Sequence, residues 1–101
     1  MNKNQNDLNE NFKIDVSTEH NKGMITVKGL VENKSDNVVC LKELTALHKN
    51  FDGFVVELDK MVCAIDLPSG ETFPFRFPER STPINCYTCE VVVSKFQVKE
   101  C

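Results

Sequence analysis

The sequence predicts an all-β fold, a sandwich of about seven short antiparallel strands. Apolar residues alternate with polar ones along most of the chain, as in strands with one buried face. Segments rich in Asn, Asp, Gly and Pro separate these runs, and short strands joined by such turns are typical of sandwiches. The clearest run spans residues 24–32, where Ile25, Val27, Gly29 and Val31 share one face.

The size and composition fit one folded domain. A chain of 101 residues is large enough to bury a single core. Its 41% hydrophobic and 27% charged residues lie within the range of globular proteins. Residues 1–10 are rich in Asn and nearly free of apolar side chains, so we expect a disordered N-terminal tail. The predicted β-sandwich domain comprises residues 11–101.

Charge and targeting patterns exclude several classes of partner. The net charge of −3 offers no basic surface for nucleic acid or for an anionic membrane. No apolar run approaches the roughly 20 residues that span a bilayer. The first residues lack the apolar stretch of a signal peptide, so we expect a cytoplasmic protein, the alternative being a trimmed targeting segment. An odd number of cysteines argues against a complete disulfide framework, and we expect reduced thiols. They are Cys40, Cys63, Cys86, Cys89 and Cys101.

The first half of the chain predicts three strands. Phe12, Ile14 and Val16 alternate with polar residues in the first, and residues 20–23 form a turn before the second, at 24–32. A polar turn at 33–37 leads into residues 38–48, for which two interpretations exist. A strand requires a bulge near Lys42 and Glu43, whereas a short helix places an apolar stripe on one side. We favour the strand, because the segment starts with β-prone residues and a hairpin turn follows at 50–53.

The second half predicts four more strands. Two of them, at 54–59 and 61–67, place their apolar residues toward the core and the acidic residues Glu57, Asp59 and Asp66 toward solvent. After a turn at 68–71, three Phe residues at 73, 75 and 77 share a core face, and Pro74 predicts an edge strand because it has no N–H to donate. A polar loop at 78–83 precedes the last strand, at 86–98.

Three segments of the chain resemble small bacterial immunoglobulin-like domains of the FxLYD type. They are Val27-Lys28-Gly29-Leu30-Val31-Glu32-Asn33, Phe51-Asp52-Gly53-Phe54 and Leu67-Pro68-Ser69-Gly70-Glu71 with Phe73 following. The resemblance covers roughly residues 12–98 and departs from the family pattern at residues 44–48. It implies an immunoglobulin-like β-sandwich with a binding or spacer role, and it carries no catalytic residues.

The most conspicuous chemical motif is the C-x-x-C pair of Cys86 and Cys89. Such a pair serves in redox centres or as half of a zinc site. Residues i and i+3 of a strand point to opposite faces, however, and no second pair of ligands is present. We therefore expect structural cysteines, with Cys89 in the core beside Val91 and redox or metal use as the alternatives. Cys40 or Cys63 could face Cys89 across the sandwich, without an obligatory bond.

Three other residues have structural interpretations. Tyr87 lies two residues before Cys89, as in the tyrosine corner of immunoglobulin sandwiches, where the hydroxyl group bonds to upstream backbone. His20 and His48 have no Ser, Cys or carboxylate at a spacing that indicates a catalytic triad, so we expect both to be solvated. The sequence therefore predicts no catalytic residue, no cofactor and no metal ligand beyond the C-x-x-C alternative.

The predicted function is that of a non-catalytic interaction or structural module. Unpaired backbone groups at an edge strand, or an exposed sheet face, would bind another protein or a second copy of the chain. One alternative is a thiol redox or metal-handling protein that uses Cys86 and Cys89. Another is a small inhibitor or immunity-type protein that blocks an enzyme through the loop at 78–85, which includes Glu79 and Arg80.

Overall fold

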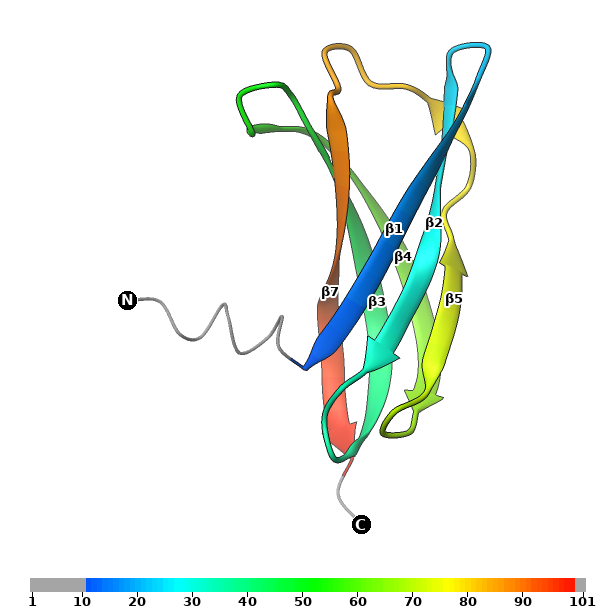
Figure 1. The fold of residues 1–101 in the computed structure, drawn as a ribbon, viewed down its shortest axis with the longest axis vertical. Coiled ribbons are helices and arrows are strands. Elements are labelled where there is room, and N and C mark those ends of the chain that lie inside the picture. Colours follow the sequence, from blue (N-terminus) through cyan, green and yellow to red (C-terminus); the bar gives the residue numbers. More distant parts are fainter. Residues whose placement is uncertain (1–10, 100–101) are drawn as a thin grey trace.

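The computed structural model describes residues 11–99, and Figure 1 shows their arrangement. The tail predicted at residues 1–10 lies outside the described residues, as does Cys101. The described strands are β1 (Phe12–Asn21), β2 (Met24–Asn33), β3 (Val38–Lys49), β4 (Val55–Leu67), β5 (Thr72–Arg76), β6 (Arg80–Ser81) and β7 (Thr88–Lys99). Residues 11–99 include no helix, and so none that could cross a membrane.

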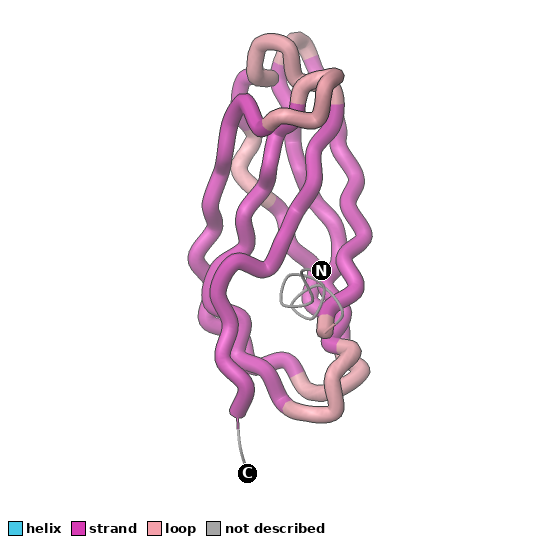
Figure 2. Tube along the Cα trace, turned by 90° about the vertical axis from the view of Figure 1, so that its left-hand side faces the viewer, coloured by secondary structure: helices cyan, strands magenta, loops and turns pink. Residues whose placement is uncertain are grey.

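The strands form two antiparallel sheets, which Figure 2 shows as two layers. The first, here called the β2 sheet, has the order β1-β2-β5, and β6 also pairs with β2. The second, the β3 sheet, has the order β4-β3-β7. The middle strands β2 and β3 follow one another in the chain, so one continuous stretch of the sequence supplies the centre of both layers.

The first two predicted strands are confirmed, and a tight hairpin joins them. Lys22 and Gly23, the two residues between β1 and β2, have φ angles of 53° and 81°. Positive φ at both central residues gives the turn a twist that matches the twist of the flanking strands. The polar residues 17–21 therefore continue β1 by pairing with β2, although they show no alternation of their own.

The segment after the 34–37 turn is a strand with a bulge, and the helical interpretation is wrong. In the pairing of β3 with both neighbours, the register shifts between Leu41 and Glu43. Leu41 and Leu44 are both fully buried although they lie three residues apart, which a regular strand does not allow. The irregularity at Lys42 turns the side chain of Leu44 back toward the core, as predicted.

The strands predicted at 54–59 and 61–67 are one strand, β4. The sequence pattern divides it into two pieces because the alternation of apolar residues changes phase near Lys60. No Gly or Pro interrupts the chain there, and the two register shifts between β3 and β4 both lie away from Lys60, which pairs regularly with Thr45. Continuous pairing therefore prevails over the local pattern.

The Phe-rich segment forms β5 at the edge of the β2 sheet. Pro74 lies opposite Leu30, and β5 has no strand on its other side among the described residues. Phe75 and Phe77 are buried, and Phe73 packs partly buried against them. The predicted edge position and core face are both confirmed.

The predicted loop at 78–83 contains a short strand, and the last strand starts later than predicted. Arg80 and Ser81 pair with Ile25 and Met24 as β6. β7 begins at Thr88, so Cys86 and Tyr87 belong to the preceding turn rather than to the strand. The described residues thus form seven strands, but the set differs from the predicted one. β4 combines two predicted strands, and β6 lies in a predicted loop.

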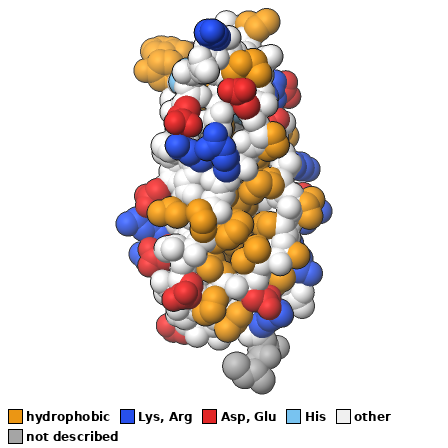
Figure 3. Space-filling model, turned by 90° about the vertical axis from the view of Figure 1, so that its right-hand side faces the viewer, with side chains coloured by type: hydrophobic (Ala, Val, Ile, Leu, Met, Phe, Trp, Pro, Cys, Tyr) orange, Lys and Arg blue, Asp and Glu red, His pale blue; other side chains and the backbone are white. Residues whose placement is uncertain are grey.

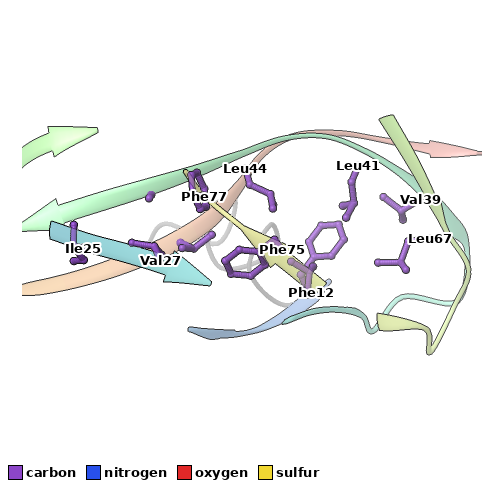
Figure 4. Close-up of a cluster of buried hydrophobic side chains, with 12 residues drawn as sticks. Phe12, Ile25, Val27, Val39, Leu41, Leu44, Leu67, Phe75 and Phe77 are labelled. Atoms are coloured by element: carbon purple, nitrogen blue, oxygen red, sulfur yellow. The ribbon is translucent and has the colours of Figure 1, made fainter. Parts of the chain in front are cut away.

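The hydrophobic core fills the space between the two sheets (Figure 4). Side chains of β2 and β5 meet those of β3, and Phe12 of β1 packs edge-on against Phe96 of β7 with ring centroids 5.1 Å apart. The buried apolar residues are Phe12, Ile25, Val27, Val31, Val39, Leu41, Leu44, Ala46, Leu67, Phe75, Phe77 and Val91.

Candidate functional site

His48 is the last inward-facing residue of β3, and it lies at the centre of a polar cluster at that end of the core. Its side chain is 0% exposed, so the predicted solvated histidine is wrong, whereas His20 is exposed as predicted. In the sheet register, His48 lies opposite Glu57 of β4 on one side and Cys89 of β7 on the other. A buried imidazole needs hydrogen-bond partners, and the neighbouring strands supply them.

Asp59 and Arg80 hold one side of the histidine ring. Nε2 of His48 lies 3.0 Å from Oδ2 of Asp59, and Oδ1 of Asp59 accepts a hydrogen bond from Arg80 at 2.9 Å. The guanidinium also lies 3.6 Å from a carboxylate oxygen of Glu57. Arg80 comes from β6 and the two acids from β4, so these contacts connect the two sheets.

Of the three acidic residues of β4 predicted to face solvent, Glu57 and Asp66 are exposed, whereas Asp59 is partly buried. Asp59 lies opposite the fully buried Ala46, and its side chain is 28% exposed. Leu58, expected on the core face, is 48% exposed. β4 pairs with β3 without a shift from Met61 to Glu57, so Asp59 lies on the same side of the strand as Met61, which is opposite Leu44, and Leu58 points the other way.

Cys86 lies on the other side of the imidazole. Its Sγ is 3.9 Å from Nδ1 of His48 and 3.6 Å from the carbonyl oxygen of Thr88. Two backbone hydrogen bonds fix the turn: Cys86 N–H donates to Pro83 at 3.2 Å, and Tyr87 N–H donates to Lys49 at 2.7 Å. Asn85 takes a φ of 66°, which Asn tolerates better than most residues. The thiol is partly exposed.

Cys89 points toward the core, as predicted. It packs partly buried against the apolar cluster that includes Val91. Burial raises the pKa of the Cys89 thiol from 9.0 to about 11, and the charges of Cys86 and Asp59 add to the shift. Two cysteines of the same motif thus differ: Cys86 is partly exposed and lies beside the buried His48, and Cys89 is held protonated.

The remaining described cysteines lie elsewhere in the same sheet. Cys40 is on β3 and Cys63 on β4, so neither faces Cys89 across the sandwich, and that prediction is wrong. Burial raises the pKa of Cys63, with smaller contributions from Cys40 and Glu43. Within residues 11–99, no group of three or more His, Cys, Asp or Glu side chains is placed to hold a metal ion.

Apolar side chains project at the loop end next to Cys86. Tyr87 is 66% exposed and packs edge-on against Phe51, with ring centroids 5.1 Å apart. Tyr87 therefore does not form the predicted tyrosine corner. An open hollow of about 450 Å³ lies between the two loops, lined by Asn50, Phe51, Asp52, Asn85, Cys86 and Tyr87.

A second group of exposed apolar side chains lies along β4. They are Val55, Val56, Leu58 and Val62, and Phe54 precedes them in the hairpin loop. Figure 3 shows hydrophobic side chains gathered in a band on the side of the molecule where β5 lies in Figure 1.

Sequence reasoning missed the cluster because its members come from four separate segments. His48, Asp59, Arg80 and Cys86 belong to β3, β4, β6 and the turn before β7. Glu57 lies opposite His48 only after a register shift beside the hairpin at residues 50–53, so the spacing along the chain carried no usable signal.

Comparison with known proteins gives no relative. No family model matches the chain, and no curated protein or solved structure matches it.

Proposed function

We propose that this protein is an immunoglobulin-like interaction module that binds an extended segment of a partner polypeptide along the free edge of β4. The observation that carries the proposal is the length and exposure of this strand. β4 has 13 residues, and among the described strands it pairs with β3 alone. Its outward-directed N–H and C=O groups are available to a partner strand.

The other edges of the two sheets are less suited to strand addition. β5 has 5 residues and contains Pro74, and short, proline-containing edges are features that prevent pairing. β1 and β7 lie against one another at the side of the sandwich where Phe12 contacts Phe96. β4 is therefore the long edge that remains accessible.

The side chains of β4 indicate the chemistry of the partner. Leu58 and Val62 project from the outer face of the β3 sheet, where polar residues are usual in a sandwich with one solvated face. A partner strand with apolar residues at alternate positions would cover them while its backbone pairs with β4. The preferred ligand is thus an extended peptide with alternating apolar side chains.

The order of the strands supports the immunoglobulin-like assignment. With β1, β2, β3, β4, β5 and β7 taken as strands A, B, C, C′, E and F, the two sheets read A-B-E and C′-C-F. The immunoglobulin fold separates its strands in this way. The FxLYD-type resemblance points to the same architecture and to a binding or spacer role.

Selection of displayed random peptides on the purified protein tests this function, because it requires no candidate partner. We expect enriched peptides with alternating apolar residues, whose binding is lost in Leu58→Lys. Leu30→Lys is the matched control, because Leu30 is 43% exposed but lies on β2. Enriched peptides that bind Leu58→Lys as well as the unaltered protein would refute binding at β4, and the absence of any enriched peptide would refute the function.

A second copy of the chain is one form that the partner strand can take. Sedimentation equilibrium of the unaltered protein and of Leu58→Lys distinguishes this case. If the unaltered protein is a dimer and Leu58→Lys is a monomer, β4 pairs with β4 of a second copy. If both proteins are monomers, the partner strand comes from a different polypeptide.

A further inference from the structure

Cys86 has the surroundings of a reactive thiol, independently of the proposed role of β4. The contacts of His48 determine which ring nitrogen carries the proton. A carboxylate only accepts hydrogen bonds, and Nε2 of His48 lies 3.0 Å from Asp59, so Nε2 carries the proton. Nδ1, on the other side of the ring, is then the acceptor, and Sγ of Cys86 lies 3.9 Å from it.

Contacts with Asp59 and Arg80 fix the position of the His48 ring. Asp59 is held by Arg80 at 2.9 Å, and the ring itself is fully buried. Asp59 and Arg80 are positioning residues in this arrangement: they fix the tautomer and orient Nδ1 toward the sulfur. An Asp–His–Cys series of this kind is the recurring way in which proteins activate a thiol, and the outer bond is often long before a substrate binds.

Cys89 supplies a second thiol at the same site. Cys86 lies outside β7, so the rule that residues i and i+3 of a strand diverge does not apply to this pair. Cys89 lies opposite His48 in the register of β3 and β7. Both cysteines therefore flank the same imidazole, Cys86 through its contact with Nδ1 and Cys89 from the neighbouring strand. Cys86 is partly exposed beside the hollow at the loop end, whereas Cys89 packs against the core.

We propose that Cys86 is the attacking thiol of a thiol–disulfide exchange site, that His48 is its base, that Cys89 is the resolving thiol, and that the substrate is a disulfide admitted through the hollow beside Tyr87.

The reaction proceeds in two balanced exchanges. Cys86 gives its proton to Nδ1 of His48, and the thiolate attacks a substrate disulfide R–S–S–R′. A bond forms between Cys86 and one sulfur, and R–S⁻ leaves with the proton from His48. Cys89 then gives its proton to the neutral imidazole and attacks Sγ of Cys86, releasing R′–S⁻, which is protonated in turn. The substrate gains two electrons and becomes two thiols, while Cys86 and Cys89 lose two electrons and become a disulfide.

The test measures the rate at which each cysteine of the full chain reacts with dithionitrobenzoic acid, a disulfide that releases a coloured thiolate. Brief exposure to limiting reagent at neutral pH, followed by peptide mass mapping, gives the rate at each site. We expect Cys86 to react about 100-fold faster than Cys40 and Cys63, at the lower end of what a positioned base contributes. The Cys86 adduct then converts to a Cys86–Cys89 disulfide, which Cys89→Ser prevents.

The substitution His48→Gln tests the role of His48 as the base. The Gln amide nitrogen takes the place of Nε2 and still donates to Asp59, but no acceptor remains at the position of Nδ1. We expect Cys86 to slow to the rate of Cys40, while circular dichroism shows an unchanged fold. Cys63→Ser, which changes a thiol away from His48, leaves the Cys86 rate unchanged.

Three results would overturn the proposal: a Cys86 rate equal to that of Cys40, an undiminished rate in folded His48→Gln, or a mixed disulfide that persists in the presence of Cys89. If His48→Gln does not fold, the rates in the unaltered chain and in Cys89→Ser still decide the question.

Discussion

Asn33 ties two turns together at the end of the sandwich opposite His48. Its side-chain N–H groups donate to the carbonyl oxygens of Asn37 and Leu67, both at 2.8 Å. Its Oδ1 accepts from the backbone N–H and the hydroxyl group of Ser35, at 2.9 and 2.7 Å. The side chain is fully buried, and its donors and both acceptor positions are occupied. Asn33, the final residue of the segment Val27–Asn33 in the family resemblance, is therefore structural.

Replacement of Asn33 by Ala should destabilise the fold substantially. The change leaves backbone groups of Leu67 and Ser35 without partners at a buried position. We expect the free energy of unfolding to fall by about 2–4 kcal/mol, since each unsatisfied buried group costs about 1–3 kcal/mol. Urea denaturation measures the change. Asn37→Ala, at an exposed position of the same turn, is the control and should be nearly neutral.

Cys89 should make the stability depend on pH in the alkaline range. Its pKa is raised from 9.0 to about 11 in the folded protein. Below pH 9 both states hold the proton, whereas between pH 9 and 11 the unfolded chain releases it first, so the stability falls as the pH rises through this range. The fall is measured as the difference in urea midpoint between the unaltered protein and Cys89→Ala. Parallel curves for the two proteins would show that the folded thiol is not held protonated.

At the scale of the element, the bulge in β3 decides which side chains enter the core. Leu41 lies before the register shift, and Leu44 and Ala46 lie after it, yet all three are fully buried. If the strand alternated regularly after Leu41, Thr45 would replace Ala46 on the inner face, because a slip of one residue exchanges the faces of a strand.

Deletion of Lys42, an exposed residue, should therefore leave the same side chains in the core. Leu41 and Leu44 are then two residues apart, the spacing at which a regular strand places both on one face, so we expect the deletion variant to keep a cooperative thermal transition. Lys42→Ala is the control and should change the free energy of unfolding by no more than about 0.5 kcal/mol, as is usual for surface positions. Loss of the transition in the deletion variant would show that the bulge does more than set the direction of these side chains.

At the scale of the whole molecule, Arg80 connects the two sheets at the polar end of the core. It extends from β6 to Asp59 and Glu57 of β4. We expect Arg80→Ala to lower the free energy of unfolding by about 1–3 kcal/mol, because Asp59 loses a charged hydrogen bond. Glu79→Ala, at the exposed neighbouring position, should be nearly neutral in the same thermal unfolding measurement. Equal effects of the two substitutions would show that the contact between the sheets contributes nothing.

The sequence predicted what local patterns determine. Alternation and turn residues identified β1, β2, the bulged β3 and the edge strand with Pro74, because each depends on a few neighbouring residues. The faces of residues 57–61 of β4 were not predicted, because pairing with β3 sets them against the local order of apolar residues. The His48 cluster was missed for the same reason: sheet pairing, not spacing along the chain, brings Asp59, Arg80 and Cys86 to the ring.

Hydrogen exchange along β4 tests the proposed function most directly. In the free protein, the amides of residues 55–67 that point away from β3 have no strand partner and should exchange rapidly. Addition of a peptide selected on the protein should protect these amides and leave those of β5 unchanged, because the peptide pairs with the edge of β4. Protection confined to residues 50–54 and 83–87, with β4 still exchanging rapidly, would place binding at the loops and contradict the account.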